Sequence, residues 1–266
     1  MVTNAECVLD CKATLGEGAV WCDRTQALYW VDILAPALHR YEPASGKDRA
    51  WLMPEPVGTV ALGPAGRVVV ALASGLAWFD PETDRLDRFL PLEDDQPNTR
   101  LNDGRCDHQG RLWVGSMSRG TPEPVGVLYR CTAREARPVL TGIQVPNCTA
   151  FSPDGRRMYF TDTPTRVVRA FDLDAETGEL SGEREFASFG GLPGLPDGAT
   201  VDADGGVWVA HWDGGRVSRF TPEGKLDRSV HVAAPRVTCC AFGGPDLGTL
   251  FITTARHGLD AGALGG

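Results

Sequence analysis

The sequence predicts an all-β fold, a six-bladed β-propeller whose blades are four-stranded antiparallel sheets. Three observations support this prediction: one pattern of residues recurs six times, more polar strands lie between the recurrences, and no stretch has the length and caps of a stable helix. Each recurrence combines an apolar strand, a turn rich in Asp, Pro and Gly, and a second apolar or aromatic strand. The six recurrences span residues 18–32, 60–71, 105–115, 150–161, 200–210 and 241–253.

The spacing of the recurrences fits one blade each, because it is roughly 40 to 50 residues, the repeat length of four-stranded propeller blades. Between them lie strands such as 37–41 and 216–220, in which polar residues alternate with apolar ones as in a half-buried third strand. The sixth recurrence is followed by no such strand, so we expect the last blade to be incomplete. We expect residues 6–12 to join this blade and to close the ring.

Length and composition predict a single domain, residues 1–266, since all-β folds of this size often form one core. The net charge of −9 and the pI near 5.1, without a run of Lys or Arg, argue against a nucleic-acid partner. No leader pattern opens the chain and no apolar run reaches membrane-spanning length, so we expect a cytoplasmic monomer without a membrane partner. The eight cysteines have no C-x-x-C spacing, and we expect them to be reduced.

A candidate site emerges when the six recurrences are aligned on the last apolar residue of each first strand. Equivalent positions of a propeller surround one mouth of its central channel, so side chains that share a register should converge there. Two carboxylates and two amides at one point would neutralise a hard divalent cation, whereas the two carboxylates alone would repel each other. The alternative is that these residues only form turns before strands. The positions, four residues before the aligned residue, are Glu17, Gly58, Asn102, Asn147, Asp197 and Thr238.

Two neighbours of Asn102 extend the candidate site. Arg100 could hold a substrate hydroxyl or a developing oxyanion, or it could be a solvated turn charge. Asp103 could orient Asn102 or a metal-bound water from outside the ligand set, or merely cap the turn. Five histidines without a His-x-x-x-His pair argue against a zinc site of imidazoles. Oxygen ligands suit calcium, magnesium or manganese, with zinc and iron(II) as further options.

Several short motifs carry a resemblance to a known family. In their order along the chain they resemble the gluconolactonase and regucalcin family of SMP-30-like six-bladed propellers, with sugar-acid lactonases such as xylonolactonase most similar in appearance. The resemblance implies one divalent metal bound by Glu17, Asn147 and Asp197, and substrate contacts from Arg100 and Asn102. It also implies hydrolysis of an aldonolactone to the open acid. The motifs are Leu-Gly-Glu-Gly-Ala-Val-Trp at 15–21, Arg-Leu-Asn-Asp-Gly at 100–104, and residues 146–147, 151–155, 196–198 and 242–247.

The chain departs from the family pattern after the Gly-Ser-Met of residues 115–117, where related sequences often carry an acidic residue. Only Glu123 could substitute for that residue in this chain. We therefore treat Glu123 as a candidate substrate contact.

The expected reaction is the metal-dependent hydrolysis of a sugar-acid lactone. A cation polarises the lactone carbonyl or the attacking water, Asp197 takes the proton of this water, and Arg100 and Asn102 orient ring hydroxyls. Two other functions would use the same metal site: an esterase acting on phosphotriesters or other esters, and a calcium-binding propeller without turnover. Arg100 beside Asn102 favours a pocket for hydroxyls or anions over a bare ion store.

Overall fold

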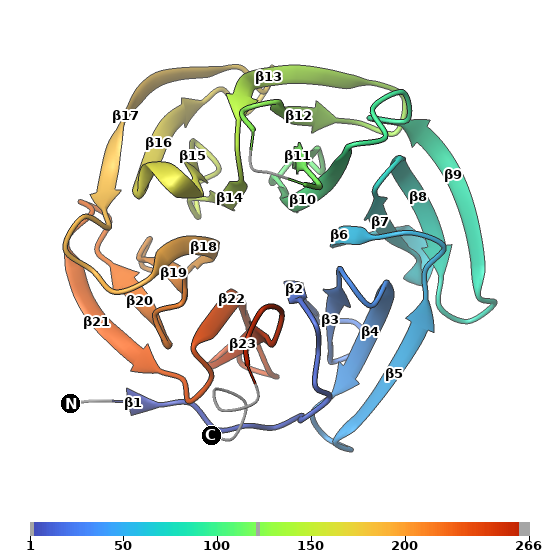
Figure 1. The fold of residues 1–266 in the computed structure, drawn as a ribbon, viewed down its shortest axis with the longest axis horizontal. Helices are drawn as coiled ribbons and strands as arrows, with labels where there is room; N and C mark the ends of the chain where they lie inside the picture. The colour runs from blue at the N-terminus through green and yellow to red at the C-terminus, as the bar shows by residue number, and fades with distance from the viewer. Residues whose placement is uncertain (1–2, 121–122, 261–266) are drawn as a thin grey trace.

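The computed structural model describes residues 3–120 and 123–260 of the chain. Twenty-three β-strands and two short 3-10 helices form these parts, and the strands belong to six sheets. The sheets stand around a central axis in the order of the chain, as the blades of a propeller do (Figure 1). No helix in the described ranges has the length and apolarity that a membrane span requires.

The first three sheets have four antiparallel strands each, paired in the order of the chain. The first holds β2 (Gly16–Cys22), β3 (Ala27–Asp32), β4 (Ala37–Glu42) and β5 (Lys47–Leu52); the second β6 (Val57–Leu62), β7 (Val68–Leu72), β8 (Gly75–Asp80) and β9 (Arg85–Pro91); the third β10 (Thr99–Cys106), β11 (Leu112–Ser118), β12 (Gly126–Cys131) and β13 (Ala136–Ile143). The helix η1 (Pro64–Gly66) lies between β6 and β7.

The remaining three sheets differ in the number of their strands. The fourth holds β14 (Pro146–Phe151), β15 (Arg157–Asp162), β16 (Val167–Leu173) and β17 (Leu180–Ser188); the fifth β18 (Leu195–Val201), β19 (Val207–Trp212), β20 (Arg216–Phe220), β21 (Leu226–His231) and the short β1 (Thr3–Asn4); the last β22 (Arg236–Gly243) and β23 (Thr249–Ala255). The helix η2 (Thr163–Thr165) follows β15. Propeller architecture with four-stranded antiparallel sheets is thus confirmed, while the last sheet has two strands within the described residues.

Ring closure differs from the sequence-based expectation. The prediction that residues 6–12 join the last sheet is wrong, because this segment contains no strand and only β1 pairs, in parallel, with β21 of the fifth sheet. The ring is closed instead by contact between β2 and β22. Main-chain hydrogen bonds support the closure, since His257 N donates to Thr14 O at 2.8 Å and Leu15 forms an isolated bridge with Ala255.

Apolar side chains fill the space between neighbouring sheets. The side chains of a strand alternate between the two faces of its sheet, and adjacent sheets cover both faces, so the second strands are rich in apolar residues. All residues of β3 are buried, and Trp113 of β11 packs with Phe151 and Phe160 of the fourth sheet. Burial of one such side chain stabilises the fold by roughly 1.5–3 kcal/mol. The packed sheets form a rigid frame that holds the innermost strands.

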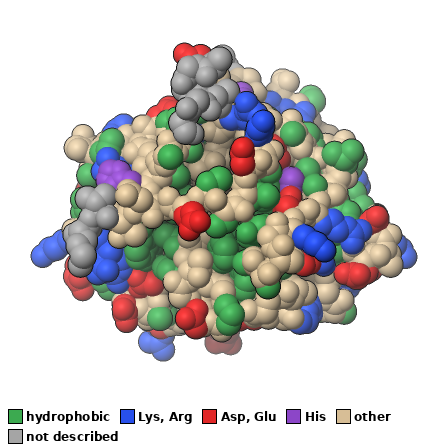
Figure 2. Space-filling view, turned by 90° about the horizontal axis from the view of Figure 1, so that it is seen from below, with side chains coloured by type: hydrophobic (Ala, Val, Ile, Leu, Met, Phe, Trp, Pro, Cys, Tyr) green, Lys and Arg blue, Asp and Glu red, His purple; other side chains and the backbone are tan. Residues whose placement is uncertain are grey.

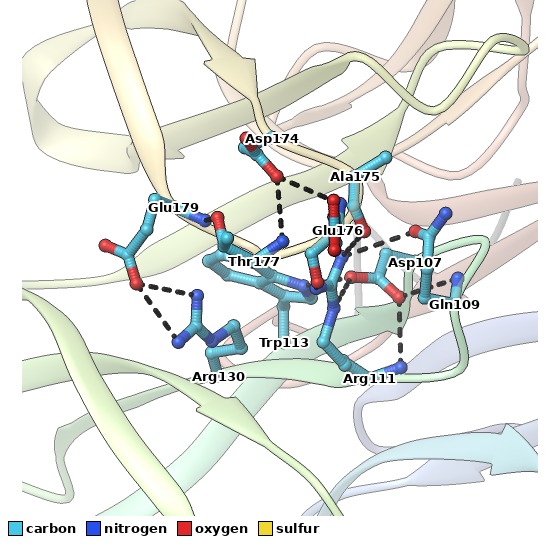
Figure 3. Close-up of polar contacts among 10 residues, drawn as sticks. All are labelled: Asp107, Gln109, Arg111, Trp113, Arg130, Asp174, Ala175, Glu176, Thr177 and Glu179. Carbon is cyan, nitrogen blue, oxygen red and sulfur yellow. Dashed lines mark hydrogen bonds and ion pairs between the residues drawn. The ribbon is translucent and has the colours of Figure 1, made fainter.

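A cluster of hydrogen bonds around Asp107, Arg111 and Trp113, which we call the latch, joins the third and fourth sheets (Figure 3). The carboxylate of Asp107, just after β10, accepts hydrogen bonds from Arg111 Nε at 2.6 Å and from the indole nitrogen of Trp113 at 3.0 Å. Arg111 donates in turn to the carbonyl of Ala175, in the turn between β16 and β17, at 3.0 Å. The side chain of Asp107 is fully buried, so removal of one partner would leave the others unpaired in a medium of low dielectric.

The rim beside the two-stranded sheet exposes apolar side chains. Leu250 and Ile252 of β23 are only partly buried, and Val8, in the segment that runs along this rim in Figure 1, is 57% exposed. Figure 2, which views the rim from below Figure 1, shows hydrophobic side chains gathered between charged ones.

None of the eight cysteines forms a disulfide.

Candidate metal and substrate site

The six aligned positions lie on the six strands closest to the central axis, which we call the inner strands: β2, β6, β10, β14, β18 and β22. Each inner strand contacts the inner strand of the next sheet, and β22 contacts β2, so they form a closed ring. Each of the six aligned positions lies within the first four residues of its inner strand. Residues from distant parts of the sequence are therefore brought to one end of this ring.

Each inner strand has one extra residue at or beside the predicted position, as in a β-bulge, and the length of the interruption in pairing separates the six positions into two groups. Pairing with the second strand of the sheet resumes three residues later where an amide or carboxylate was predicted, and two residues later where Gly58 or Thr238 stands. A bulge redirects a side chain out of the regular alternation. The interruptions follow Glu17, Leu101, Asn147 and Pro196 in the first group and Val57 and Val237 in the second.

Two of the longer interruptions contain a left-handed residue directly after a candidate ligand. Gly18, after Glu17, has φ of 61°, and Cys148, after Asn147, has φ of 56°. Glycine adopts this conformation readily, whereas Cys148 does so under strain, as residues at functional sites often do. The thiol of Cys148 donates to the carbonyl of Asp197 at 2.8 Å. The main chains that carry Asn147 and Asp197 are thereby tied together.

Glu17 and Asp197 form a buried carboxylate pair. Each is at most 6% exposed, and the two side chains lie close enough to perturb each other's pKa. Burial raises the pKa of Glu17, and the charge of Asp103 raises it further. Burial also raises the pKa of Asp197, with the charge of Glu17 as the next cause. Both carboxylates can be ionised together only beside a compensating cation.

The donor set fits a hard divalent cation. Two carboxylates and the amide oxygen of Asn147 are the oxygen ligands that calcium, magnesium and manganese prefer. Within residues 3–120 and 123–260, no three His, Cys, Asp or Glu side chains are grouped as a metal site. The raised pKa of both carboxylates reflects buried charge that a cation would compensate.

The two asparagines connect the third and fourth sheets. Asn102 Nδ2 donates to the carbonyl of Pro146 at 3.0 Å and to Asn147 Oδ1 at 3.3 Å. Asn147 Nδ2 donates to Thr163 Oγ1 at 2.9 Å. Both asparagines are buried, so their amides are held by protein groups rather than by bulk water.

Arg100 is the cation of this group. Its Nη1 donates to Asn102 Oδ1 at 2.6 Å and to the carbonyl of Leu101 at 3.1 Å. Burial lowers the pKa of Arg100 to about 10, while the charges of Glu17 and Asp197 act in the opposite direction. Arg100 therefore stays charged at neutral pH and links the asparagines electrostatically to the carboxylate pair.

Asp103 has a different partner from the one expected. Its Oδ2 accepts a hydrogen bond from Thr149 N at 2.8 Å, which ties β10 to β14. The amide of Asn102 is held by other groups. Burial raises the pKa of Asp103, and its charge in turn raises the pKa of Glu17 and of Asp197. Asp103 thus acts on the carboxylate pair through charge rather than on Asn102 through a hydrogen bond.

The remaining predicted positions, Gly58, Thr238 and Glu123, do not belong to the group formed by the carboxylate pair, the two asparagines and Arg100. A Cβ at Gly58 would stand 2.5 Å from the carbonyl oxygen of Asn102, so only glycine fits there. Thr238 donates to the carbonyl of Gly16 and supports ring closure. Glu123 is exposed in the loop between β11 and β12, and its carbonyl accepts from Val125 N.

The alignment missed the residues that anchor the inner strands. Asp32, at the end of β3, accepts from the main-chain nitrogens of Thr14 and Leu15, directly before Glu17. Asp162, at the end of β15, accepts from Val145 N in the same way before Asn147. The signal was present in the sequence, because an Asp ends the second strand of both sheets. Thr163 carried no comparable signal.

Comparison with known proteins places the chain in a family. The SMP-30/Gluconolactonase/LRE-like region matches residues 15–256. The chain is 42% identical to L-arabinolactonase of Azospirillum brasilense, over 98% of this chain and 87% of the relative, and 38% identical to 6-deoxy-6-sulfogluconolactonase of Pseudomonas putida, over 98% and 90%. The structure superposes with a TM-score of 0.94 on a calcium-binding regucalcin of Agrobacterium tumefaciens, at 33% identity over 97% of this chain and 88% of the other. The chain therefore belongs to the SMP-30/gluconolactonase/LRE-like family.

Proposed function

We propose that this protein hydrolyses the ring ester of sugar-acid lactones to the open aldonic acids, using one divalent cation held by Glu17, Asn147 and Asp197. The observation that carries the proposal is the buried pair of Glu17 and Asp197, which needs a compensating cation, together with Arg100 and Asn102 beside it. Relatives named as sugar lactonases, at 42% and 38% identity over nearly the whole chain, support the substrate class.

The chain's own residues have separate roles in this proposal. When bound, the cation supplies Lewis-acid polarisation of the ring ester. Asp197 accepts a proton from the attacking water and returns it to the ring oxygen as the carbon–oxygen bond breaks. Arg100 and Asn102 hold ring hydroxyls, since Asn102 Oδ1 has one lone pair beyond the bond from Arg100. Glu123, on its exposed loop, would act only on a substrate that extends out of the buried group.

The proposal includes the architecture around the site. We infer that β22 and β23 are the inner half of a sixth blade and that residues 1–266 act as one domain. Support comes from the inner ring, in which β22 takes the place of an inner strand between β18 and β2. The donor set favours calcium, magnesium or manganese, with zinc and iron(II) as alternatives.

A calcium-binding role without turnover is the rival function, favoured by the superposition on a protein described as calcium-binding. Proton release from several aldonolactones, followed in a pH-stat with and without chelator, separates the two. We expect turnover that chelation abolishes and added divalent metal restores. Metal binding without turnover of any lactone would favour the rival.

Arg100 distinguishes the two functions by substitution. In Arg100→Lys the charge stays, but one ammonium cannot reproduce the fork that holds Asn102 Oδ1, so kcat/KM should fall by roughly one to two decades, or about 1–3 kcal/mol of transition-state binding. Metal affinity, measured by calorimetry, should hardly change. The exposed Arg49, exchanged in the same way, is the control.

If the protein only binds calcium, substitution of Arg100 should change metal affinity rather than lactone turnover. In Arg100→Ala a cation beside the metal site is lost, so metal binding should tighten with no catalysis to lose. Unchanged lactone turnover in Arg100→Ala would remove Arg100 from the proposed reaction.

A further inference from the structure

A continuous chain of hydrogen bonds crosses three sheets at the candidate site. Arg100 Nη1 donates to Asn102 Oδ1 at 2.6 Å, and Asn102 Nδ2 donates to Asn147 Oδ1 at 3.3 Å. Asn147 Nδ2 donates to Thr163 Oγ1 at 2.9 Å, and Thr163 Oγ1 donates to the carbonyl of Pro196 at 2.8 Å. This series of hydrogen bonds thus begins beside the carboxylate pair and ends at the residue before Asp197.

The first donor, Arg100, and the last acceptor, the carbonyl of Pro196, determine the direction of every hydrogen bond between them. A guanidinium can only donate, so Asn102 must present its oxygen to Arg100 and its nitrogen to Asn147. A peptide carbonyl can only accept, so the single hydroxyl proton of Thr163 goes to Pro196. Thr163 can then only accept from Asn147, which must turn its nitrogen toward Thr163 and its oxygen away.

We infer that Thr163 is a positioning residue for the metal ligand Asn147. Its hydroxyl selects the amide orientation in which the nitrogen is engaged and the oxygen keeps a lone pair for a cation beside the bond from Asn102, an inference that rests on the proposed function. The bond from Asn102 favours the same orientation, but it is longer, 3.3 Å against 2.9 Å. Because the same hydroxyl bonds to the peptide before Asp197, it also fixes the fourth sheet relative to the fifth.

The fold itself does not require a hydroxyl at this place. Thr163 N donates to the carbonyl of Val145 at 2.9 Å, and three other sheets repeat this bond between the end of the second strand and the residue that precedes the inner strand. In the third sheet Arg119 donates to Asn98 O; in the first two the equivalent residues are Ile33, which donates to Leu15 O, and Ala73, which donates to Pro56 O. Both are buried and aliphatic. The hydrogen bonds of the Thr163 hydroxyl, and not the fold, therefore account for its presence. A protein with an aliphatic residue at this position should still fold.

Three variants test the inference. Thr163→Val removes the hydroxyl and keeps the shape, Thr163→Ser keeps the hydroxyl, and Thr165→Val removes a hydroxyl from the same helix η2 that bonds to Asp162 O and lies exposed. Calorimetric titration with Ca²⁺ and with Mn²⁺ should show affinity weakened by about ten- to a hundredfold in Thr163→Val, as is typical when a group that orients a ligand is lost. Thr163→Ser and Thr165→Val should bind as the wild type does. Equal affinity of Thr163→Val and wild type would overturn the inference.

A second measurement keeps the inference separate from the proposed function. In the metal-free wild type, NMR should show the side-chain amide protons of Asn147 protected from exchange with water, and Thr163→Val should lose this protection while Thr163→Ser keeps it. If the wild type binds neither metal yet shows the protection, the proposed metal site fails and the orienting contact stands. If Thr163→Val keeps the protection, Thr163 does not orient Asn147.

Discussion

Asp197→Asn is expected to reduce lactone turnover by about a thousandfold or more, since the variant loses a proposed metal ligand together with the proposed proton acceptor. The metal-free variant should nevertheless be at least as stable as the metal-free wild type. Burial and the charge of Glu17 raise the pKa of Asp197, so a neutral amide of the same shape removes the repulsion between two buried carboxylates. Calorimetry and thermal unfolding in the presence of chelator measure both effects.

Added metal should reverse the order of stability. A ligand that binds only the folded state raises the melting temperature in proportion to the logarithm of its concentration, so the wild type should gain and Asp197→Asn should not. The exposed Asp204, replaced by Asn, is the matched control and should behave as the wild type. Retained metal stoichiometry with wild-type activity would rule out the role of Asp197.

Asp107→Ala is expected to produce the largest loss of stability, about 3–5 kcal/mol, measured by denaturant unfolding of the metal-free protein. The substitution leaves Arg111 and the indole of Trp113 without their buried acceptor and also removes hydrogen bonds to two main-chain nitrogens of the turn. Turnover per folded molecule should stay unchanged, because the latch lies outside the candidate site.

Asp154 offers the matched control for the latch. It occupies the corresponding turn of the fourth sheet, where it accepts from Ser152 Oγ and Arg156 N but is exposed. Asp154→Ala should cost less than about 1 kcal/mol, as surface contacts usually do. A similarly small loss in Asp107→Ala would mean that Arg111 and Trp113 find other partners.

The sequence predicted the propeller and the candidate positions because both depend on repetition. Each sheet needs the same order of apolar strand, turn and apolar strand, and that order recurs at a blade-sized interval. The bulges preserve one register around the ring, so stepping back a constant number of residues reached Glu17, Asn102, Asn147 and Asp197 alike. No long-range contact had to be known for this inference.

The features that the sequence did not predict depend on single contacts in three dimensions. Residues 6–12 have enough apolar character for a strand, but pairing depends on which free edge lies within reach, and only β1 finds one, on β21. Asp103 could hydrogen-bond either to Asn102 or to the next inner strand, and the bulge in β10 directs its side chain to Thr149 N. Thr163 occupies a place where Ile33 and Ala73 serve equally well in other sheets, so no periodic pattern marks it.

The closure of the ring has a consequence for the order in which the molecule assembles. Contacts such as that between Thr238 and the carbonyl of Gly16, 222 residues apart, join the two most distant sheets of the described chain. Contacts of such separation carry a large loop entropy and form late in folding. Glu17 belongs to the first sheet and Asp197 to the fifth, so their meeting also awaits this step. A cation that bridges them would recognise only molecules whose folding is finished, and its capture would report the last event of folding.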